Sequence, residues 1–441
     1  MGTLMPSTLS TQLNRIAETA KRSPTYQFKT IAHLINVDLM INAFGKIRKD
    51  AAAGADGVTA EAYGQDLKKN LASLHERMKQ GHYRAQPLRR VYIEKENGKL
   101  RPLSIPATED KIAQRAVVEI LERIYENDFL PCSFGYRPGR NAWQALGAID
   151  KQIGLGKTNY ILDADIADYF GTIVRKELMT MLQKRIGDKD VLRLIGKWLN
   201  AGVIDKGRML LTDDGVFQGA TISPILANLY LHEVLDLWFE HTVKPRMRGE
   251  VALFRYADDF IICFEHKDDA ERLQGALQRR FTKYGLTLSA EKTKLIEFGR
   301  YALIKSERKG EKPDTFNFLG FCHYCGRTRK GKFTVKVKTM SKRLGRGLQR
   351  MADWCRINRH WKVKDQWRHL CRALKGHYNY YGRVFNHASL GRYYRGALRL
   401  WKKWLGRRGS GPLSWEEFAV LLARYPLPEP RIAQNWGTAH G

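Results

Sequence analysis

Apolar residues at helical spacing predict helices in the first part of the chain. Residues 1–80 follow this pattern, and the glycine-rich stretch AAAGADGVT at 52–59 interrupts it. The segment 109–126 follows it more strongly, and one face of the predicted helix carries Ile112, Ala116, Val117, Ile120 and Ile124. We therefore expect helices around the break at 52–59 and one amphipathic helix over 109–126.

Three other segments predict β-strands. In RRVYIEKENGKLRPLSIP (89–106), two short apolar runs flank the turn Glu96-Asn97-Gly98, which is a strong hairpin signal. TNYILDADIADYF (158–170) predicts a buried strand that runs into an acid-rich end. FRYADDFIICF (254–264) predicts a second hairpin, in which two apolar arms enclose a pair of adjacent acids.

Helical patterns return in the second half of the chain. Residues 221–240 and 269–284 each predict a helix, and the composition then changes near residue 330. Three amphipathic helices follow, with basic residues facing outward. Their inward faces carry Met340, Leu344, Leu348 and Met351; Trp367, Leu370, Cys371, Leu374 and Tyr381; and Leu390, Tyr394, Ala397, Leu398, Trp401 and Leu405. This pattern predicts a separate basic helical bundle, joined through the linker-like residues 406–412 to a short tail.

The adjacent acids Asp258 and Asp259 are unusual inside an apolar stretch, because like charges repel and a buried carboxylate without a partner is costly. Taken alone, the stretch is explained as well by a hairpin turn, in which Asp is favoured. Asp165 ends the strand predicted about 90 residues earlier. If the two strands share an antiparallel sheet, three carboxylates converge at its edge. Mg²⁺ suits such a cluster, since it takes carboxylate and phosphate oxygens, and two ions would serve phosphoryl transfer.

Basic residues dominate the charge and gather toward the C-terminus. The 76 Lys and Arg exceed the 45 Asp and Glu, which gives a net charge of +31. Residues 301–441 hold 31 Lys and Arg against 8 Asp and Glu, so this last third carries +23 of the total. Any single basic cluster is explained by a solvated surface. An excess of this size, interleaved with Trp and Tyr, favours a polyanionic partner such as nucleic acid.

The composition argues against a membrane or secreted protein. A chain of 441 residues with 43% hydrophobic content fits two or three globular domains. No apolar run approaches the roughly 20 residues of a membrane span, and the start has no apolar segment of a secretory signal. Among six scattered cysteines only Cys322 and Cys325 form a CxxC, for which buried thiols are a better interpretation than zinc binding with His323. We expect reduced thiols, no membrane association and a location in the bacterial cytoplasm.

Tyr256-Ala257-Asp258-Asp259 resembles the YADD form of the YxDD motif in reverse transcriptases encoded by group II introns. Four residues alone are a weak signal, but other blocks resemble the same family in its order along the chain. These blocks are RPLSIPATEDKIAQRA, SFGYRPGRNAWQAL, DADIADYF, VFQGATISPILANLYLHEVLD, YGLTLSAEKTK, FNFLGF and, in the maturase region, KGHYNYYGRV. The matches cover roughly residues 30–405.

This resemblance implies a fold and an order of domains. The fold is an α/β right-hand polymerase, with fingers and an antiparallel palm sheet, followed by an α-helical thumb or maturase domain. The bounds implied are 1–85 for an N-terminal extension and the start of the fingers, 86–330 for fingers and palm, 331–405 for the basic thumb and maturase domain, and 406–441 for a tail that is a candidate DNA-binding segment.

The resemblance also implies roles for single residues. Asp165 and Asp258 match the catalytic metal ligands, Asp259 completes the acidic triad, and Ile166 is included with them as a metal contact. The implied cofactor is Mg²⁺, as two ions, with Mn²⁺ as a substitute.

A second group of residues matches the binding site for the incoming dNTP. Lys95 and Arg101 match the fingers pair that grips the triphosphate, for which the fork of Arg is well suited. Phe170 matches the bulky gate that collides with a ribose 2′-hydroxyl, with core packing as the alternative role. Gln218 and Gly219 match the QG step that lines the nucleotide pocket.

The chain departs from the family pattern in two places. The family usually has Asp after the gate Phe, where this chain has Gly171, and Thr-Pro before the QG step, where it has Val216 and Phe217. We expect altered packing at Gly171 and a reshaped nucleotide pocket at 216–217, with the reaction class unchanged.

The function implied is an RNA-directed DNA polymerase that binds intron RNA as a maturase, assists splicing and supports retrohoming by target-primed reverse transcription. Its partners would be intron or template RNA, a DNA primer or target, and dNTPs. Two alternatives stay open: a free-standing reverse transcriptase of this type in phage defence or repair, and a splicing-only RNA-binding cofactor, against which the intact triad argues. The final YPLPEPRIAQNWGTAHG has neither the cysteines nor the histidine cluster of an HNH endonuclease, so we expect priming at nascent strands or other nicks.

Overall fold

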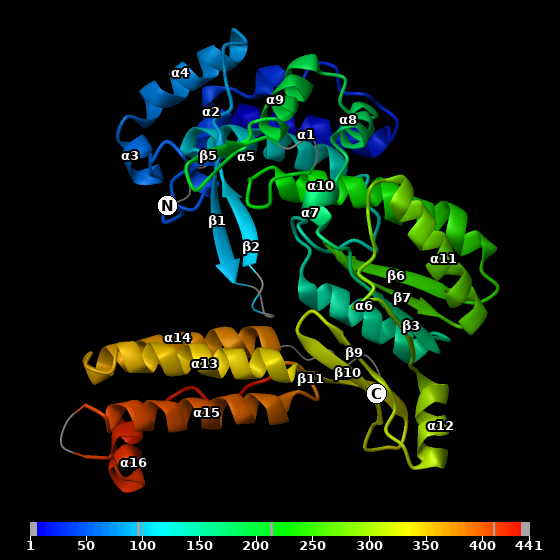
Figure 1. The fold of residues 1–441 in the computed structure, drawn as a ribbon, viewed down its shortest axis with the longest axis vertical. Helices are drawn as coiled ribbons and strands as arrows, with labels where there is room; N and C mark the ends of the chain where they lie inside the picture. The colour runs from blue at the N-terminus through cyan, green and yellow to red at the C-terminus, as the bar shows by residue number, and fades with distance from the viewer. Residues whose placement is uncertain (1–6, 95–97, 99, 212–214, 409–410, 434–441) are drawn as a thin grey trace. The chain divides into compact units, whose positions relative to one another are not determined.

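The computed structural model describes residues 7–94, 98, 100–211, 215–408 and 411–433. Within these ranges the chain forms a mixed α/β fold with three β-sheets and a helical C-terminal region (Figure 1). No described helix is both long enough and apolar enough to cross a membrane.

The first half of the chain alternates helices and short strands. Its elements are α1 (Ser7–Arg22), η1 (Ala32–Leu34), α2 (Val37–Lys46), α3 (Ala60–Gln65), α4 (Leu67–Lys79), β1 (Leu88–Glu94), β2 (Leu100–Ile105), α5 (Thr108–Tyr125), α6 (Ala142–Leu155), β3 (Tyr160–Ala164), α7 (Tyr169–Thr172), α8 (Arg175–Gln183), α9 (Lys189–Leu199), β4 (Val203–Asp205) and β5 (Arg208–Leu210).

The second half begins with a long helical segment and ends in the C-terminal helices. Its elements are α10 (Ser223–Leu231), η2 (His232–Asp236), η3 (Phe239–Val243), η4 (Lys244–Arg246), β6 (Val251–Tyr256), β7 (Asp259–Phe264), α11 (Lys267–Lys283), β8 (Lys294–Glu297), α12 (Arg300–Lys309), β9 (Thr315–Phe318), β10 (Phe321–Arg327), β11 (Phe333–Thr339), α13 (Ser341–Ile357), α14 (Val363–Tyr381), α15 (His387–Leu405) and α16 (Trp415–Arg424).

Three sheets organise the strands. Their strand orders are β2-β1-β4-β5, β6-β7-β3-β8 and β11-β10-β9. In the first, β1 and β2 pair antiparallel from Arg89 opposite Ile105 to Glu94 opposite Leu100. This confirms the two predicted strands of the first hairpin; of its turn, Glu96 and Asn97 lie outside the described residues.

The chain divides into two compact units, each described here by itself. Unit 1 comprises Met1–Ala145, Ala164–Ile262 and Asp268–Lys294, and unit 2 comprises Leu146–Asp163, Cys263–Lys267 and Leu295–Gly441.

Helix α5 forms the centre of unit 1. It follows the predicted segment closely, and α1 and α2 pack against it. Its apolar residues lie almost completely out of contact with water, as do most of those in α10. A helix that is apolar over most of its circumference is stable only when protein surrounds it. The sequence pattern of 109–126 therefore predicts its helix correctly but underestimates its burial.

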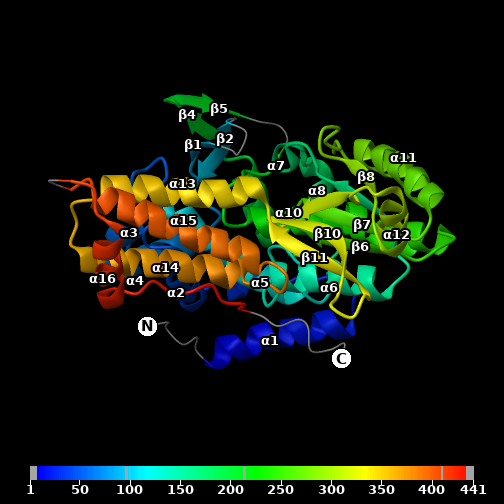
Figure 2. The ribbon, with the colours of Figure 1, turned by 90° about the horizontal axis from the view of Figure 1, so that it is seen from below.

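Unit 2 contains the predicted bundle of basic helices. Helices α13, α14 and α15 lie side by side, and α16 crosses one end of them (Figures 1 and 2). Their core is spaced at helical intervals and holds Leu344, Met351, Cys355, Leu370, Leu374, Tyr378, Leu390, Tyr393, Ala397, Trp401 and Leu405. Burial of these side chains is what stabilises the bundle, since its outward faces carry a large excess of positive charge.

Two features of unit 2 were not predicted. The strands β9, β10 and β11 form an antiparallel sheet across the position near 330 where the composition changes. The tail contains α16 and then runs back along α14, where the carbonyl of Pro426 accepts a bond from Trp367 (2.8 Å) and that of Pro428 one from Tyr378 (3.1 Å).

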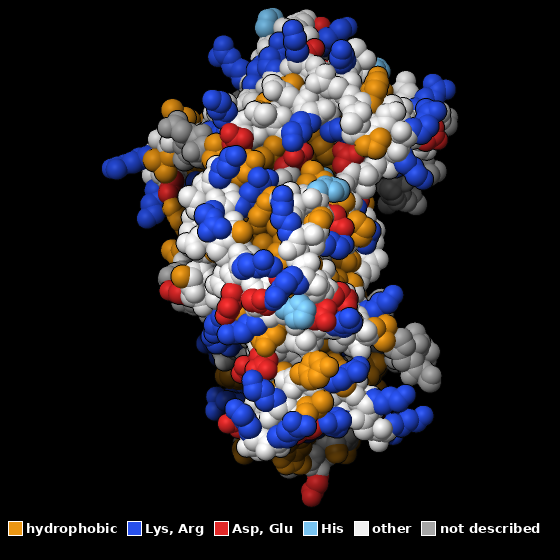
Figure 3. Space-filling model, turned by 90° about the vertical axis from the view of Figure 1, so that its right-hand side faces the viewer, with side chains coloured by type: hydrophobic (Ala, Val, Ile, Leu, Met, Phe, Trp, Pro, Cys, Tyr) orange, Lys and Arg blue, Asp and Glu red, His pale blue; other side chains and the backbone are white. Residues whose placement is uncertain are grey.

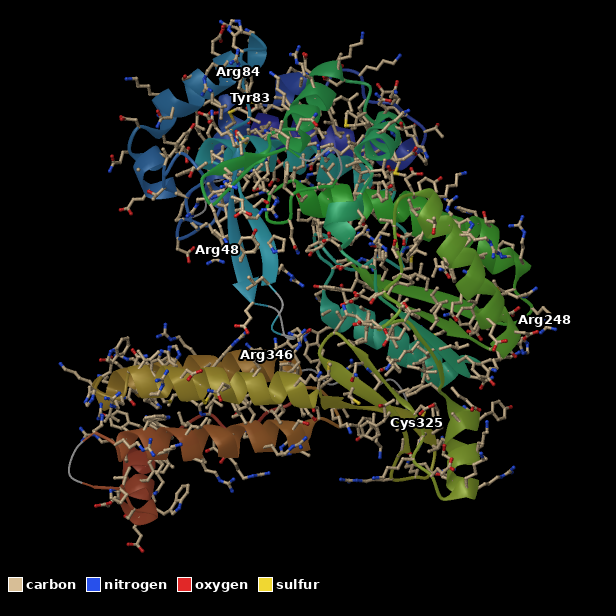
Figure 4. All side chains as sticks on the ribbon, in the orientation of Figure 1. Arg48, Tyr83, Arg84, Arg248, Cys325 and Arg346 are labelled. Carbon is tan, nitrogen blue, oxygen red and sulfur yellow. The ribbon has the colours of Figure 1, made fainter. Side chains whose placement is uncertain are left out.

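The CxxC pair lies in strand β10, and its two cysteines point to opposite faces. Cys325, labelled in Figure 4, is buried together with His323, whereas Cys322 is half-buried. All six cysteines are free thiols. Because alternate residues of a strand face opposite ways, Cys322 and Cys325 cannot share one metal ion, and the preference for buried thiols over a zinc site is consistent with this geometry.

Candidate active site

The hairpin of β6 and β7 carries Asp258 and Asp259 at its turn. The residue before them, Ala257, has a φ of +59°, a conformation that side chains with a Cβ adopt rarely. The backbone of Gly135 lies directly against this turn: a Cβ at Gly135 would come within 2.4 Å of the amide nitrogen of Ala257. The glycine of the SFGYRPGR block is therefore required for the 133–135 segment to support the acidic turn.

Arg255 anchors the same turn from inside the protein. Its side chain is completely buried and forms an ion pair with the equally buried Asp236 (2.6 Å). Nη1 donates to Asn228 and to the carbonyl of Ala257 (3.0 Å each), and Nη2 also donates to Ser133 (2.8 Å). With two bonds to Asp236, all five N–H groups of the guanidinium have partners. One planar fork thus connects the turn to three other segments of unit 1.

The two acids of the turn are electrostatically strained in the absence of bound cations. Burial and the charge of Asp165 raise the pKa of Asp258, and Arg101 and Lys292 offset part of this effect. Burial, the charges of Asp258 and Asp165, and a hydrogen bond with Asp165 raise the pKa of Asp259 to about 7. These effects show that Asp165, Asp258 and Asp259 do converge, as the strand pattern predicts.

Lys292 provides the counter-charge in this cluster. Its ammonium group forms a salt bridge with Asp165 Oδ2. Burial lowers the pKa of Lys292, but the hydrogen bond to Asp165 and the other two acids outweigh this, so its pKa is raised. The backbone holds this pair in register, because the carbonyl of Asp165 accepts a bond from the Ser289 amide (2.8 Å). Lys292 lies in the YGLTLSAEKTK block, and this block therefore contributes a positive charge to the site.

The donor set fits a hard divalent cation, but not in the present arrangement of its side chains. Carboxylate oxygens are the ligands that Mg²⁺ prefers, and their mutually raised pKa values show uncompensated negative charge. Among the described residues, no three side chains are arranged as the ligands of an ion, and Lys292 pairs with the first acid. An ion that binds Asp165 through Oδ2 would compete with Lys292 for this oxygen. Ile166 is buried and bridges to Leu288 through its backbone.

The residues expected to bind a dNTP are partly brought together. Arg101, exposed on β2, is close enough to lower the pKa of Asp258. The carbonyl of Gln218 accepts a bond from the Ser104 amide (2.8 Å), which attaches the QG step to the same strand. Gly219 has a φ of +108° and passes within contact distance of Ser104, so a side chain here would clash. Lys95 lies outside the described residues.

Phe170 is held beside the unusual segment 216–217. It belongs to the short helix α7, is half-buried, and its carbonyl accepts a bond from the Val216 amide (2.7 Å). Phe217 is buried next to Leu88 and Val203. At Gly171, a Cβ would come within 2.4 Å of the Asp168 carboxylate. The carboxylate of Asp168 thus occupies the space next to Gly171, as expected if that departure changes packing.

Three residues near the acids were not singled out from the sequence. Arg255 and Lys292 lie in quoted motifs, but their partners are 19 and 127 positions away. The side chain of Tyr136 is half exposed, and its partial burial and the charge of Asp258 raise the pKa of its hydroxyl. Local spacing in the sequence does not indicate which distant charges will meet. The only sequence signal for these contacts was Arg255, an arginine at an inward-facing position of a predicted strand.

Comparison with known proteins supports the resemblance. Residues 93–323 match the family model described as reverse transcriptase (RNA-dependent DNA polymerase). Protein YkfC of Escherichia coli strain K12 is 31% identical over 347 residues, which are 69% of this chain and 90% of that protein. The group II intron-encoded protein LtrA of Lactococcus lactis subsp. cremoris is 30% identical over 309 residues, which are 66% of this chain and 50% of LtrA. The putative COX1/OXI3 intron 1 protein of Saccharomyces cerevisiae is 26% identical over 306 residues, 58% of this chain and 36% of that protein.

Proposed function

Because this chain belongs to the reverse transcriptase (RNA-dependent DNA polymerase) family, we propose that it is a polymerase of the group II intron type that also acts as a maturase. In this proposal it copies RNA into DNA, binds intron RNA to assist splicing, and supports retrohoming by target-primed reverse transcription. The observation that supports this most is the convergence of Asp165, Asp258 and Asp259 around one turn.

The proposed layout is that of a right hand. Residues 86–330 would form fingers and palm, with 1–85 as an N-terminal extension, and residues 331–405 would form the thumb and maturase domain. Lys and Arg side chains are spread over the face drawn in Figure 3, in keeping with the net charge of +31. Such a surface attracts the phosphates of template RNA and primer DNA. The tail, 406–441, is a candidate DNA-binding segment.

In the proposed mechanism the acids hold the reacting groups in place. Asp165 and Asp258 would bind two Mg²⁺ ions, with Asp259 and the backbone of Ile166 beside them. When bound, the ions activate the primer 3′-hydroxyl and neutralise charge on the triphosphate. Lys292 would release Asp165 and remain nearby as a positive charge. Arg255 keeps the turn rigid, so that the carboxylates need little reorganisation.

The remaining residues would select the nucleotide. Arg101, with Lys95, would hold phosphate oxygens through charge-assisted bonds. Phe170 would exclude a ribose 2′-hydroxyl, while Gln218 and Gly219 would line the pocket against Ser104. The hydrogen bond from the Val216 amide to the Phe170 carbonyl supports a role of the unusual 216–217 segment in the shape of this pocket.

A splicing assay tests the intron-specific part of this proposal. The DNA on either side of the gene is first examined for a folded group II intron with a bulged-adenosine branch helix. Its precursor RNA is then incubated at a low Mg²⁺ concentration, with no protein, with wild type, or with the Asp258→Ala/Asp259→Ala variant. Splicing that needs protein, and that both proteins promote, is the expected result. An absence of intron RNA, with no stimulated splicing, would instead favour a free-standing reverse transcriptase.

A further inference from the structure

A cavity of about 480 Å³ lies among α13, α14 and α15 of unit 2. This volume falls within the range of small-ligand sites, about 300–1,000 Å³. Arg343, Arg346 and Arg350 line it from α13, where spacings of three and four residues bring them onto one face. Arg346, labelled in Figure 4, is half-buried. None of the described residues that line the cavity is acidic.

Aromatic and histidine rings line the cavity beside the arginines. Trp354 of α13 stacks on His369 of α14, with ring centroids 3.8 Å apart, and His377 of α14 stacks on Tyr393 of α15 at 3.6 Å. Burial lowers the pKa of His377 to about 4, so this ring is neutral near pH 7. Its Nε2 is buried and has no hydrogen-bond partner. The cavity therefore combines arginine cations with aromatic rings.

We propose that this cavity binds one unpaired nucleotide of an RNA strand. A nucleotide joins a planar base to a phosphate, and the cavity presents planar rings beside arginine forks. Arginine binds phosphate oxygens through two parallel bonds, and unpaired RNA bases are recognised by stacking and by bonds to their edges. The base enters between the ring pairs, and the arginines bind the adjoining phosphate.

A base that remains paired in a duplex is unsuited to this cavity. Its edges are engaged by the opposite strand, and both of its faces are covered by neighbouring bases. In a bulged or looped nucleotide, the edges and both faces of the base are exposed. The motif KGHYNYYGRV contributes His377 and Tyr381 to the lining. The proposal therefore also assigns a function to this motif, which the acidic cluster of unit 1 does not explain.

Binding of an RNA hairpin with a single bulged adenosine tests the proposal on the full-length chain. The comparison probe is the same hairpin with an abasic residue at the bulge, which keeps the phosphates and removes the base. We expect wild type to bind the bulged hairpin about tenfold more tightly, a factor within the range for stacking one base on protein rings. Equal affinity of wild type for the two hairpins would overturn the proposal.

Two variants and a matched control locate the effect. Ala373, which lines the cavity from α14, is replaced by Trp to fill it while all arginines stay. Ala373→Trp should abolish the tenfold difference and leave affinity for the abasic hairpin unchanged. Arg346→Ala should weaken binding of the bulged hairpin several-fold, whereas Arg399→Ala, an exposed arginine of α15 outside the cavity, should leave the difference intact. A difference that survives Ala373→Trp would show that the base binds elsewhere.

Two further measurements keep the result decisive. Thermal melting of each variant shows whether the fold is preserved, and this readout does not require RNA binding. A 4-thiouridine at the bulge should crosslink to a peptide containing Trp354 or Tyr381; crosslinks confined to unit 1 would contradict the proposal. Free AMP is titrated separately, and binding of AMP as tight as that of the bulged hairpin would assign the cavity to a free nucleotide. Because the assay measures RNA binding alone, failure of splicing or retrohoming does not affect its outcome.

Discussion

Replacing Arg255 by Met should destabilise unit 1 more than almost any other single substitution of a charged residue. The guanidinium and Asp236 are both completely buried, and the ion pair is bidentate, at 2.8 and 2.6 Å. Removal of one partner leaves the other charge in the interior without compensation, which typically costs about 3–5 kcal/mol. Asn228, Ser133 and the carbonyl of Ala257 would each lose a bond as well. We therefore expect a loss near the upper end of this range.

A double-mutant cycle separates the pair from its surroundings. Asp236→Leu should cost a similar amount, because it leaves Arg255 unpaired. The double variant Arg255→Met/Asp236→Leu should cost less than the sum by about 2 kcal/mol or more, since neither charge is then buried alone. Lys244→Met serves as the control: it breaks an ion pair with Glu240 in the same unit, but side chains that are 48% and 42% exposed should make this loss about 0.5 kcal/mol or less.

Native-state hydrogen exchange is the appropriate assay, because the two units can unfold separately. Urea-dependent exchange of peptides covering 251–264 reports the free energy of opening for this hairpin. The reasoning is refuted if Arg255→Met lowers that free energy no more than Lys244→Met does, or if the two substitutions of the buried pair are additive. In the first case the pair would contribute no more than a surface ion pair.

Two further predictions concern the residues around the acids. Phe170→Ala should reduce the preference for dNTPs over rNTPs in primer extension by about tenfold or more, because it removes the bulk that meets a 2′-hydroxyl; lower stability with an unchanged preference would assign Phe170 to core packing instead. Asp259 has its pKa raised to about 7, so the metal-free native state takes up a proton there. Protonation of Asp259 in the native state therefore favours folding. This contribution to the free energy of unfolding is fully present below the ordinary pKa of about 4 and is lost as the pH rises through about 7. In EDTA, the melting temperature of Asp259→Asn should therefore fall less between pH 5 and pH 8 than that of wild type, and parallel pH profiles would show that Asp259 is not protonated in the native state.

Much of the fold follows from local spacing in the sequence. The alternating runs around 89–106 and the helical period of 109–126 and 341–405 predict the corresponding strands and helices, because each element buries one face. The strands β9 to β11 were missed because glycines interrupt the pattern, although the alternation of valine and lysine in β11 is typical of a half-buried strand. The helix α16 was also missed in a segment treated as a tail.

The acids of the candidate site could be predicted from the sequence, but the ion pairs that hold them in place could not. Adjacent carboxylates between apolar arms are explained as well by a turn, and it is Asp165 together with the other motifs of the family that makes them a candidate site in the sequence. The pairs Arg255–Asp236 and Lys292–Asp165 depend on tertiary contacts, and no periodicity encodes which charges meet across a fold. The cavity in unit 2 is built from side chains of three helices, and it likewise appears only when those helices are packed.

Primer extension tests the central claim most directly. Wild type, Asp165→Asn and Asp258→Ala/Asp259→Ala are incubated with an RNA template, a DNA primer, dNTPs and Mg²⁺, with Asp353→Asn, an acid of unit 2 far along the chain, as the matched control. The account predicts extension by wild type and the control, and none by the variants of the acidic cluster. Extension by Asp165→Asn and by the double variant at the wild-type rate would contradict it, because the reaction would then not depend on the carboxylates that meet at this turn.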